Sequence, residues 1–125
     1  MEIVRRVYAA WERGDVPGPS ELLDPGVEYV NPGGAIEPGT RRGLGEFTQA
    51  LQKVFESYEY WRADMEKAEA IGDQVVVVVR YRLRGRGSGV EIEGRESALW
   101  TLRDGKVVRY EWFHGPDDAA AAVDS

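Results

Sequence analysis

Hydrophobic residues recur at helical spacing in two stretches of the N-terminal half of the chain. The first stretch spans residues 1–13, and its apolar positions are Ile3, Val4, Val7, Tyr8 and Trp11. The second spans residues 44–58, and its apolar positions are Leu44, Phe47, Leu51, Val54, Phe55 and Tyr58. This spacing places the apolar side chains of each stretch on one side of a helix. The pattern predicts two long amphipathic helices.

Elsewhere the pattern is that of strands. "VEYVN", Val27 to Asn31, is a short strand, with a turn or two of helix before it at Leu22 and Leu23 and a loop after it up to residue 43. Four strand-like segments follow, separated by Gly-Asp, Gly-Ser-Gly and Asp-Gly turns: residues 61–73, 74–89, 90–105 and 106–115. Residues 116–123 form a short helix or a frayed tail. This order predicts an α+β fold, with helices packed on one face of a curved, mostly antiparallel sheet.

Alternation along the strands indicates which side chains face the helices. In the strand that begins at residue 74, they are Val75, Val77, Val79, Tyr81 and Leu83. In the two strands after it, they are Gly94, Glu96, Ala98, Trp100, Leu102, Val108, Tyr110, Trp112 and His114. The first strand adds Val27, Tyr29 and Asn31. Aromatic rings, one imidazole, one carboxylate and one amide are therefore expected around a shared interior, which is the usual form of a small-molecule site.

Three polar residues of this interior, Asn31, Glu96 and His114, are the candidate catalytic residues. A histidine titrates near neutrality and can transfer protons, and a carboxylate among tryptophans tends to have a raised pKa. Each residue also has a second interpretation: Asn31 as a turn residue before proline, His114 as a rim or dimer contact, and Glu96 as a solvated partner of Arg95. The candidate ligand-binding residues are Tyr29, Tyr81, Trp100, Tyr110 and Trp112, of which Trp100, Tyr110 and Trp112 also suit the core.

Composition narrows the classes of partner and cofactor. The chain has 125 residues, 42% hydrophobic and 30% charged, which suits one globular domain over residues 1–125. A net charge of -6 argues against nucleic acid. With no cysteine and one histidine, a thiolate or histidine-rich metal site is excluded, and no glycine-rich phosphate loop indicates a cofactor. The longest apolar run, Val75 to Val79, is too short for a membrane span, and no secretory leader is recognised, so a cytoplasmic location is expected.

The order of elements and several short motifs resemble the nuclear transport factor 2-like superfamily. The motifs are "ERGD" after the first helix, "VEYVNPGG" in the first strand, "VVVV" after a Gly-Asp turn and "LRDGKVVRYEWFHGP" near the end. Within that superfamily the chain is similar to SnoaL-like and ketosteroid isomerase-like proteins. The resemblance covers nearly the whole chain and implies one SnoaL-like domain: a cone of helices on a bent, cystatin-like sheet that encloses a pocket.

The resemblance also implies that the usual catalytic acids of these enzymes are absent. Asn31 stands where ketosteroid isomerases keep a catalytic aspartate, and an amide cannot accept a proton as a carboxylate does. The two oxyanion donors of those enzymes fall on Val7 and Ala98. "Tyr29-Val30-Asn31" resembles the water-holding part of limonene epoxide hydrolase-like enzymes, whose charged residues fall on Val79, Tyr81 and Trp112. We therefore expect no ketosteroid isomerase activity.

Two functions remain open from the sequence. The first is a protein that binds a small hydrophobic molecule in its pocket and, if it is an enzyme, is a cofactor-independent isomerase, lyase (such as a cyclase) or hydrolase. The second is a non-catalytic binding or dimeric interaction module whose pocket is closed by Trp100 and Trp112. A homodimer through the outer sheet face is expected, because that face would otherwise expose an apolar patch made of Val76, Val78, Leu99 and Phe113.

The outer face also carries a basic stripe, made of Arg80, Arg82, Arg84 and Arg86. Acidic residues on neighbouring strands face it: Glu91, Glu93 and Glu111. Cross-strand pairing or a dimer seam explains this arrangement better than anion binding.

Overall fold

The computed structural model describes residues 1–35 and 38–123. Its elements are α1 (Glu2–Glu12), the 3-10 turn η1 (Ser20–Leu22), β1 (Leu23–Asn31), β2 (Gly39–Arg42), α2 (Leu44–Glu56), β3 (Tyr58–Ile71), β4 (Gln74–Gly85), β5 (Glu91–Arg103), β6 (Lys106–Phe113) and α3 (Asp118–Val123). No helix in this described part of the chain is long and apolar enough to cross a membrane.

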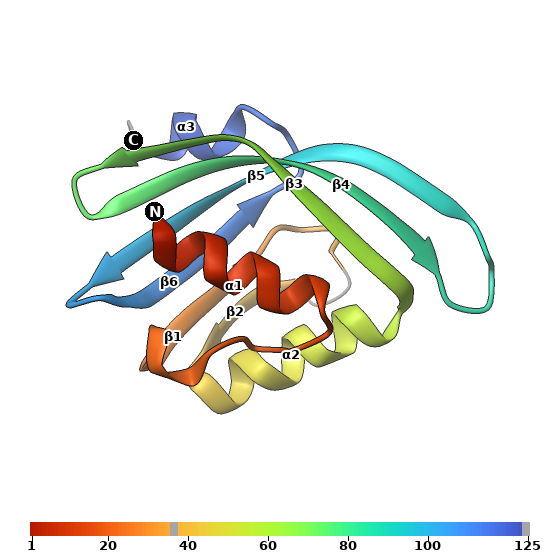
Figure 1. Ribbon diagram of the computed structural model, residues 1–125, viewed down its shortest axis with the longest axis horizontal. Coiled ribbons are helices and arrows are strands. Elements are labelled where there is room, and N and C mark those ends of the chain that lie inside the picture. The colour runs from red at the N-terminus through yellow and green to blue at the C-terminus, as the bar shows by residue number, and fades with distance from the viewer. Residues whose placement is uncertain (36–37, 124–125) are drawn as a thin grey trace.

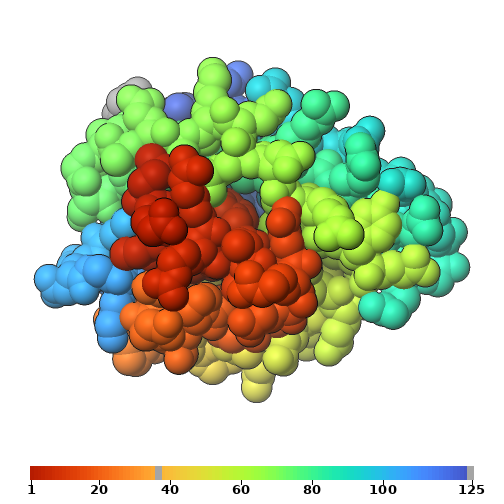
Figure 2. All heavy atoms as spheres, in the orientation of Figure 1, coloured from red at the N-terminus to blue at the C-terminus, as the bar shows by residue number. Residues whose placement is uncertain are grey.

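The strands form one six-stranded sheet in the order β2-β1-β6-β5-β4-β3. β1 runs parallel to β6, and the other neighbours are antiparallel. The long strands β3, β4 and β5 curve over α1 and α2, while α3 lies across the opposite face of the sheet (Figure 1). In the space-filling view, α1 and the chain that follows it cover the front of the molecule (Figure 2). The α+β fold predicted from the sequence, with helices on one face of a curved, mostly antiparallel sheet, is confirmed.

The two long helices form where the apolar spacing predicts them. α1 buries Val4, Val7, Tyr8, Ala10 and Trp11. It ends where Gly14 takes a φ of 80°, a conformation that glycine adopts more easily than other residues. α2 buries Phe47, Ala50 and Leu51 against the sheet. Burial of these stripes, rather than intrinsic helix propensity, supplies most of the stability of such short helices.

Two segments near β1 differ from the prediction. The helix expected around Leu22 and Leu23 is only the three-residue turn η1, and Leu23 already begins β1. The expected loop before α2 contains the strand β2, which pairs with β1 from Glu28 opposite Arg42 to Asn31 opposite Gly39. β2 is an exposed edge strand without a buried face, so its sequence lacks the apolar alternation that marks the other strands.

A β-bulge changes the expected faces of the first part of β6. The sequence predicted Val108 inward and Val107 outward, but Val107 is fully buried and Val108 is only partly buried. Thr101 of β5 pairs with Arg109, whereas the next residue of β5 pairs with Val107, so Val108 is an extra residue on β6. Such an insertion shifts the side chains of one strand by one position. Beyond the bulge, alternation is restored.

The part of the outer sheet face around Val76 and Leu99 is covered by α3 rather than left open. Val76, Val78 and Leu99 were expected in an exposed apolar patch, but they are 7%, 8% and 6% exposed. The fully buried Ala119 of α3 packs against Val76 and Leu99. The Ser97 hydroxyl accepts a hydrogen bond from the backbone N–H of Ala119 at 3.0 Å, which holds the start of α3 on the sheet. The argument for a dimer from this patch is therefore wrong, and the homodimer itself stays a prediction.

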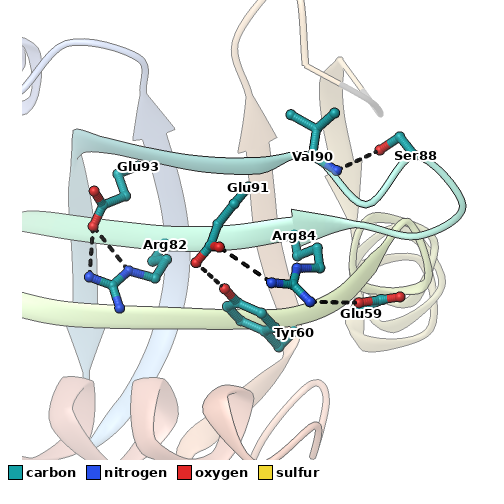
Figure 3. Close-up of polar contacts among 8 residues, drawn as sticks. All are labelled: Glu59, Tyr60, Arg82, Arg84, Ser88, Val90, Glu91 and Glu93. Carbon is teal, nitrogen blue, oxygen red and sulfur yellow. Dashed lines mark hydrogen bonds and ion pairs between the residues drawn. The ribbon is translucent and has the colours of Figure 1, made fainter.

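Two arginines of the basic stripe, Arg82 and Arg84, form the expected ion pairs across the strands, whereas Arg86 donates to the backbone carbonyls of Glu56 and Tyr58. Arg82 of β4 donates two hydrogen bonds to Glu93 of β5, at 3.0 and 2.8 Å. Arg84 donates to Glu91 at 3.4 Å, and Figure 3 shows both pairs side by side. Glu111 does not join them, since it lies 3.4 Å from an arginine of its own strand. These are exposed contacts, so they contribute little individually to stability.

Candidate functional site

A cavity of about 270 Å³ lies between the inner face of the sheet and α2. Its described lining comprises Trp11, Tyr29, Gly34, Ala35, Leu51, Val54, Phe55, Tyr58, Trp61, Tyr81, Leu83, Ile92, Glu96, Tyr110, Trp112 and His114. An apolar cavity of about 150 Å³ in another protein holds benzene, and pockets for drug-sized ligands begin near about 300 Å³. The space therefore suits a small ring-containing molecule.

Glu96 is the one acidic residue among the described residues that line the cavity. It lies on β5 opposite Val79 of β4, and alternation carries its half-buried side chain to the inner face. Arg95 points to the outer face, where its Nε lies 2.7 Å from a carboxylate oxygen of Glu66. The alternative that Glu96 is paired with Arg95 does not apply.

Burial raises the pKa of Glu96 from 4.5 to about 7. The cause is the loss of water around the carboxylate, which disfavours its charged form. Among the described residues, none donates a hydrogen bond to this carboxyl group that would offset the loss. Glu96 therefore exchanges its proton near neutral pH.

Tyrosines from five elements surround this carboxyl group. They are Tyr8 on α1, Tyr29 on β1, Tyr58 on β3, Tyr81 on β4 and Tyr110 on β6. Burial and, secondarily, the negative charge of Glu96 raise the pKa of each of these phenols. All five hydroxyls therefore stay neutral when Glu96 titrates. When Glu96 gains or loses its proton, the charge of the carboxyl group changes while the five phenols around it keep their protons.

Asn31, Trp112 and His114 form a second polar group at one end of the cavity. The Trp112 indole N–H donates a hydrogen bond to Asn31 Oδ1. The Trp112 ring meets the His114 ring edge to face, with 5.0 Å between centroids. His114 Nε2 lies 3.0 Å from the Gly33 carbonyl oxygen, and since a carbonyl only accepts, Nε2 carries the proton. In a neutral ring with this tautomer, Nδ1 is the nitrogen with a free lone pair.

The structure brings most of the predicted site residues to this one cavity. Those that border it are Tyr29, Tyr81, Glu96, Tyr110, Trp112 and His114. Asn31 does not border it but bonds Trp112, which does. Its own Nδ2 is buried without a hydrogen-bond partner among the described residues. Trp100 is also absent from the lining, because α1 packs over it: its indole N–H donates to the Tyr8 hydroxyl at 3.3 Å. Trp100 belongs to the core and does not close the pocket.

Four aromatic lining residues were not among the predicted site residues: Trp11, Phe55, Tyr58 and Trp61. Trp11 and Phe55 lie on the apolar stripes of the two long helices, where sequence periodicity indicates burial but not contact with a cavity. Their rings are 6.1 Å apart, and Phe55 meets Trp61 at 5.2 Å. Tyr58 was predicted at the end of the second helix, but α2 ends at Glu56 and Tyr58 begins β3. Trp61 also lies on β3, whose pairing with β4 shifts twice, so alternation gave it no clear face. Within the described residues, no group of three or more histidine, aspartate or glutamate side chains could hold a metal ion.

Comparison with known proteins gives the family. A family model described as a SnoaL-like domain matches residues 4–110. The chain belongs to the SnoaL-like family. This SnoaL-like chain is 30% identical over 121 residues to an uncharacterized protein of Mycobacterium tuberculosis, covering 96% of this chain and 91% of the relative.

Solved structures place the same SnoaL-like chain in the nuclear transport factor 2-like superfamily. The TerC protein, co-crystallized with polyporic acid, is 25% identical with a TM-score of 0.80, over 99% of this chain and 97% of TerC. A nuclear transport factor 2-like protein of Burkholderia thailandensis is 27% identical with a TM-score of 0.80, over 98% of this chain and 95% of that chain. The superfamily predicted from the sequence motifs is confirmed.

Proposed function

We propose that this SnoaL-like protein binds a small, mainly apolar, ring-containing molecule in the cavity and that Glu96 exchanges a proton with it. One observation carries the proposal: the described lining is mainly apolar and aromatic, and it contains one carboxyl group that no described residue bonds. Pockets with a few convergent polar groups and a perturbed pKa are the usual form of binding and active sites.

The chemistry of this site is acid–base chemistry without a cofactor. Because the pKa of Glu96 is raised to about 7, both its charged and its neutral forms are present near neutral pH. The charged form can accept a proton from a bound molecule, and the neutral form can return it. Isomerases, lyases and hydrolases all use such a step. His114 at the rim is the second proton acceptor, and Asn31 is a positioning residue that holds Trp112.

Two further facts support binding over a closed interaction module. TerC, which is 25% identical over nearly its whole length, was co-crystallized with a small organic molecule, polyporic acid. A cavity of about 270 Å³ is also more than close packing leaves in an ordinary core. The dimer predicted from the sequence remains compatible with this function and is tested separately by sedimentation.

The test of binding uses a neutral two-ring probe, naphthalen-1-ylmethanol, titrated by calorimetry. Val54 of α2 borders the cavity, so Val54→Trp should fill part of it and weaken binding by about tenfold or more, equivalent to about 1.4 kcal/mol. Gln49→Trp, on the exposed side of the same helix, is the matched control and should bind like wild type. Equal affinity of wild type and Val54→Trp would place the probe elsewhere, and no binding by wild type would remove the proposal.

A further inference from the structure

The charges around the cavity restrict the chemistry of its ligand. Glu96 contributes the negative charge, and no lysine or arginine is among the lining residues within the described ranges 1–35 and 38–123. The arginine nearest to it in sequence, Arg95, is engaged with Glu66 on the outer face. A ligand with a negative charge would meet Glu96 without a lysine or arginine among the described lining residues to offset the repulsion. The cavity is therefore unsuited to an anion when Glu96 is charged.

The aromatic rings favour the opposite charge. Among the described residues, eight aromatic side chains border the cavity, and they come from helices on one side and strands on the other. Trp11, Trp61 and Trp112 are among them, and tryptophan is the ring that attracts cations most strongly through its negative face. A box of aromatic rings with one carboxylate is the form in which proteins recognise organic ammonium groups.

Glu96 also lacks a partner of its own. A buried carboxylate is normally stabilised by hydrogen bonds or by an opposite charge, and none of the described residues supplies either to Glu96. The titratable groups that face it are the phenols of Tyr8, Tyr29, Tyr58, Tyr81 and Tyr110, which stay neutral, and the His114 imidazole at the rim of the same cavity. A cation held inside the cavity would supply the missing charge.

We propose that the ligand is an organic amine, bound in its protonated form with the ammonium group against Glu96 and its apolar part among the aromatic rings. The inference rests on the proposed function, because it uses the same cavity, and goes further by naming the class of ligand. It also explains why the chain places a carboxyl group, rather than an amide, at this position of β5.

The main competing ligand is a neutral carbonyl or hydroxyl compound, and pH separates the two. A protonated amine needs the charged form of Glu96, so its affinity should rise as the pH increases from 6 to 8. A neutral acceptor would take a hydrogen bond from the protonated form, so its affinity should fall over the same range. Binding of the amine at pH 6 should also release a proton from Glu96, which calorimetry in two buffers of different ionisation enthalpy detects.

Three probes with the same ring system provide the test: naphthalen-1-ylmethylamine, naphthalen-1-ylmethanol and 1-naphthoate. At pH 8 the amine should bind about tenfold or more tightly than the alcohol, in the range for a hydrogen bond to a charged group, and the acid most weakly. In Glu96→Gln this preference for the amine should disappear. Glu93→Gln, on the same strand but in an exposed ion pair, is the control for net charge and should keep it.

The outcomes separate this inference from the proposed function. If the alcohol binds in the cavity as tightly as the amine at pH 8, the amine class is wrong while the binding function stands. The amine class is also wrong if Glu96→Gln leaves the affinity for the amine unchanged. It is likewise wrong if Glu93→Gln lowers the affinity for the amine as much as Glu96→Gln does. If none of the three probes binds wild type, both proposals fail.

Discussion

Ionisation of Glu96 should make the protein less stable as the pH rises toward 8. The folded protein raises the pKa of this carboxyl group from 4.5 to about 7 through burial. Between these two values the folded state binds more protons than the unfolded state. The free energy of unfolding therefore falls with increasing pH in this window, which is the opposite of the behaviour of a carboxylate in an ion pair.

The shift sets the size of the effect. A difference between 4.5 and about 7 is about 2.5 units, and at about 1.4 kcal/mol per unit it corresponds to a loss of about 3 kcal/mol over the whole titration. Between pH 5 and pH 8, where part of the unfolded-state titration is already complete, the loss is about 2 to 3 kcal/mol. Glu96 is only half-buried, so water screens part of the effect. The loss of about 2 to 3 kcal/mol is therefore an upper limit.

The assay is urea unfolding of wild type and Glu96→Gln at pH 5 and pH 8. The glutamine keeps the size of the side chain but cannot ionise. The free energy of unfolding of the variant minus that of wild type should therefore be about 2 to 3 kcal/mol larger at pH 8 than at pH 5. Subtracting the pH 5 difference removes any effect of the amide itself. Glu93→Gln is the control, and its difference should change by less than about 1 kcal/mol, as for an exposed ion pair. Equal differences at both pH values for Glu96→Gln would refute the burial of an unpaired carboxyl group.

Four further predictions follow from the same contacts. Asn31→Ala should lower the free energy of unfolding by about 1 to 3 kcal/mol in urea titrations, because it leaves the Trp112 indole N–H without its acceptor. Gly94→Ala should cost about 1 to 3 kcal/mol and change probe affinity, since its Cβ would lie 2.6 Å from the Tyr81 hydroxyl oxygen; wild-type values for both would contradict this packing. Ala119→Asp should dislodge α3 and raise self-association in sedimentation, whereas an unchanged sedimentation coefficient would show that α3 does not cover the sheet. A Δ5-3-ketosteroid should not be isomerised, as measured by absorbance, because the resemblance to ketosteroid isomerases implies that Asn31 stands at the position of their catalytic aspartate.

The fold was predictable wherever one face of an element is buried. Apolar residues at helical spacing located α1 and α2, and alternation located β4 and β5, because burial selects the residues of one face. The same signal is absent from β2, an exposed edge strand with no buried face. It is also shifted in β6, where the additional residue Val108 moves Val107 into the core. A bulge is set by pairing with a neighbouring strand, and a pattern within one strand does not contain that information.

The candidate site was also predictable only in part: the sequence indicated which side chains face inward, but not which of them border the cavity. Glu96 faces inward on β5, and Tyr110 faces inward on the part of β6 beyond the bulge, where alternation is regular, so the sequence was sufficient to place them in the interior. Trp100 has the same inward phase, yet α1 covers it and it lies behind the cavity wall. Trp11 lies on α1 and was treated as core, although it borders the cavity. Which inward residues meet an open space depends on how the helices sit on the sheet, and that is a property of the whole fold.

The polar groups inside this fold differ in how well they are satisfied, and the difference argues for function. Ser97, fully buried next to Glu96, donates to the Gly115 carbonyl at 2.6 Å and accepts from Ala119 at 3.0 Å. Asn31 has its acceptor filled by Trp112, although its Nδ2 has no partner among the described residues. Glu96 alone among these three places an ionisable group in an apolar space with no partner from the described residues. An apolar residue there would fold more stably, so the carboxyl group is best explained by a molecule that enters the cavity and completes its interactions.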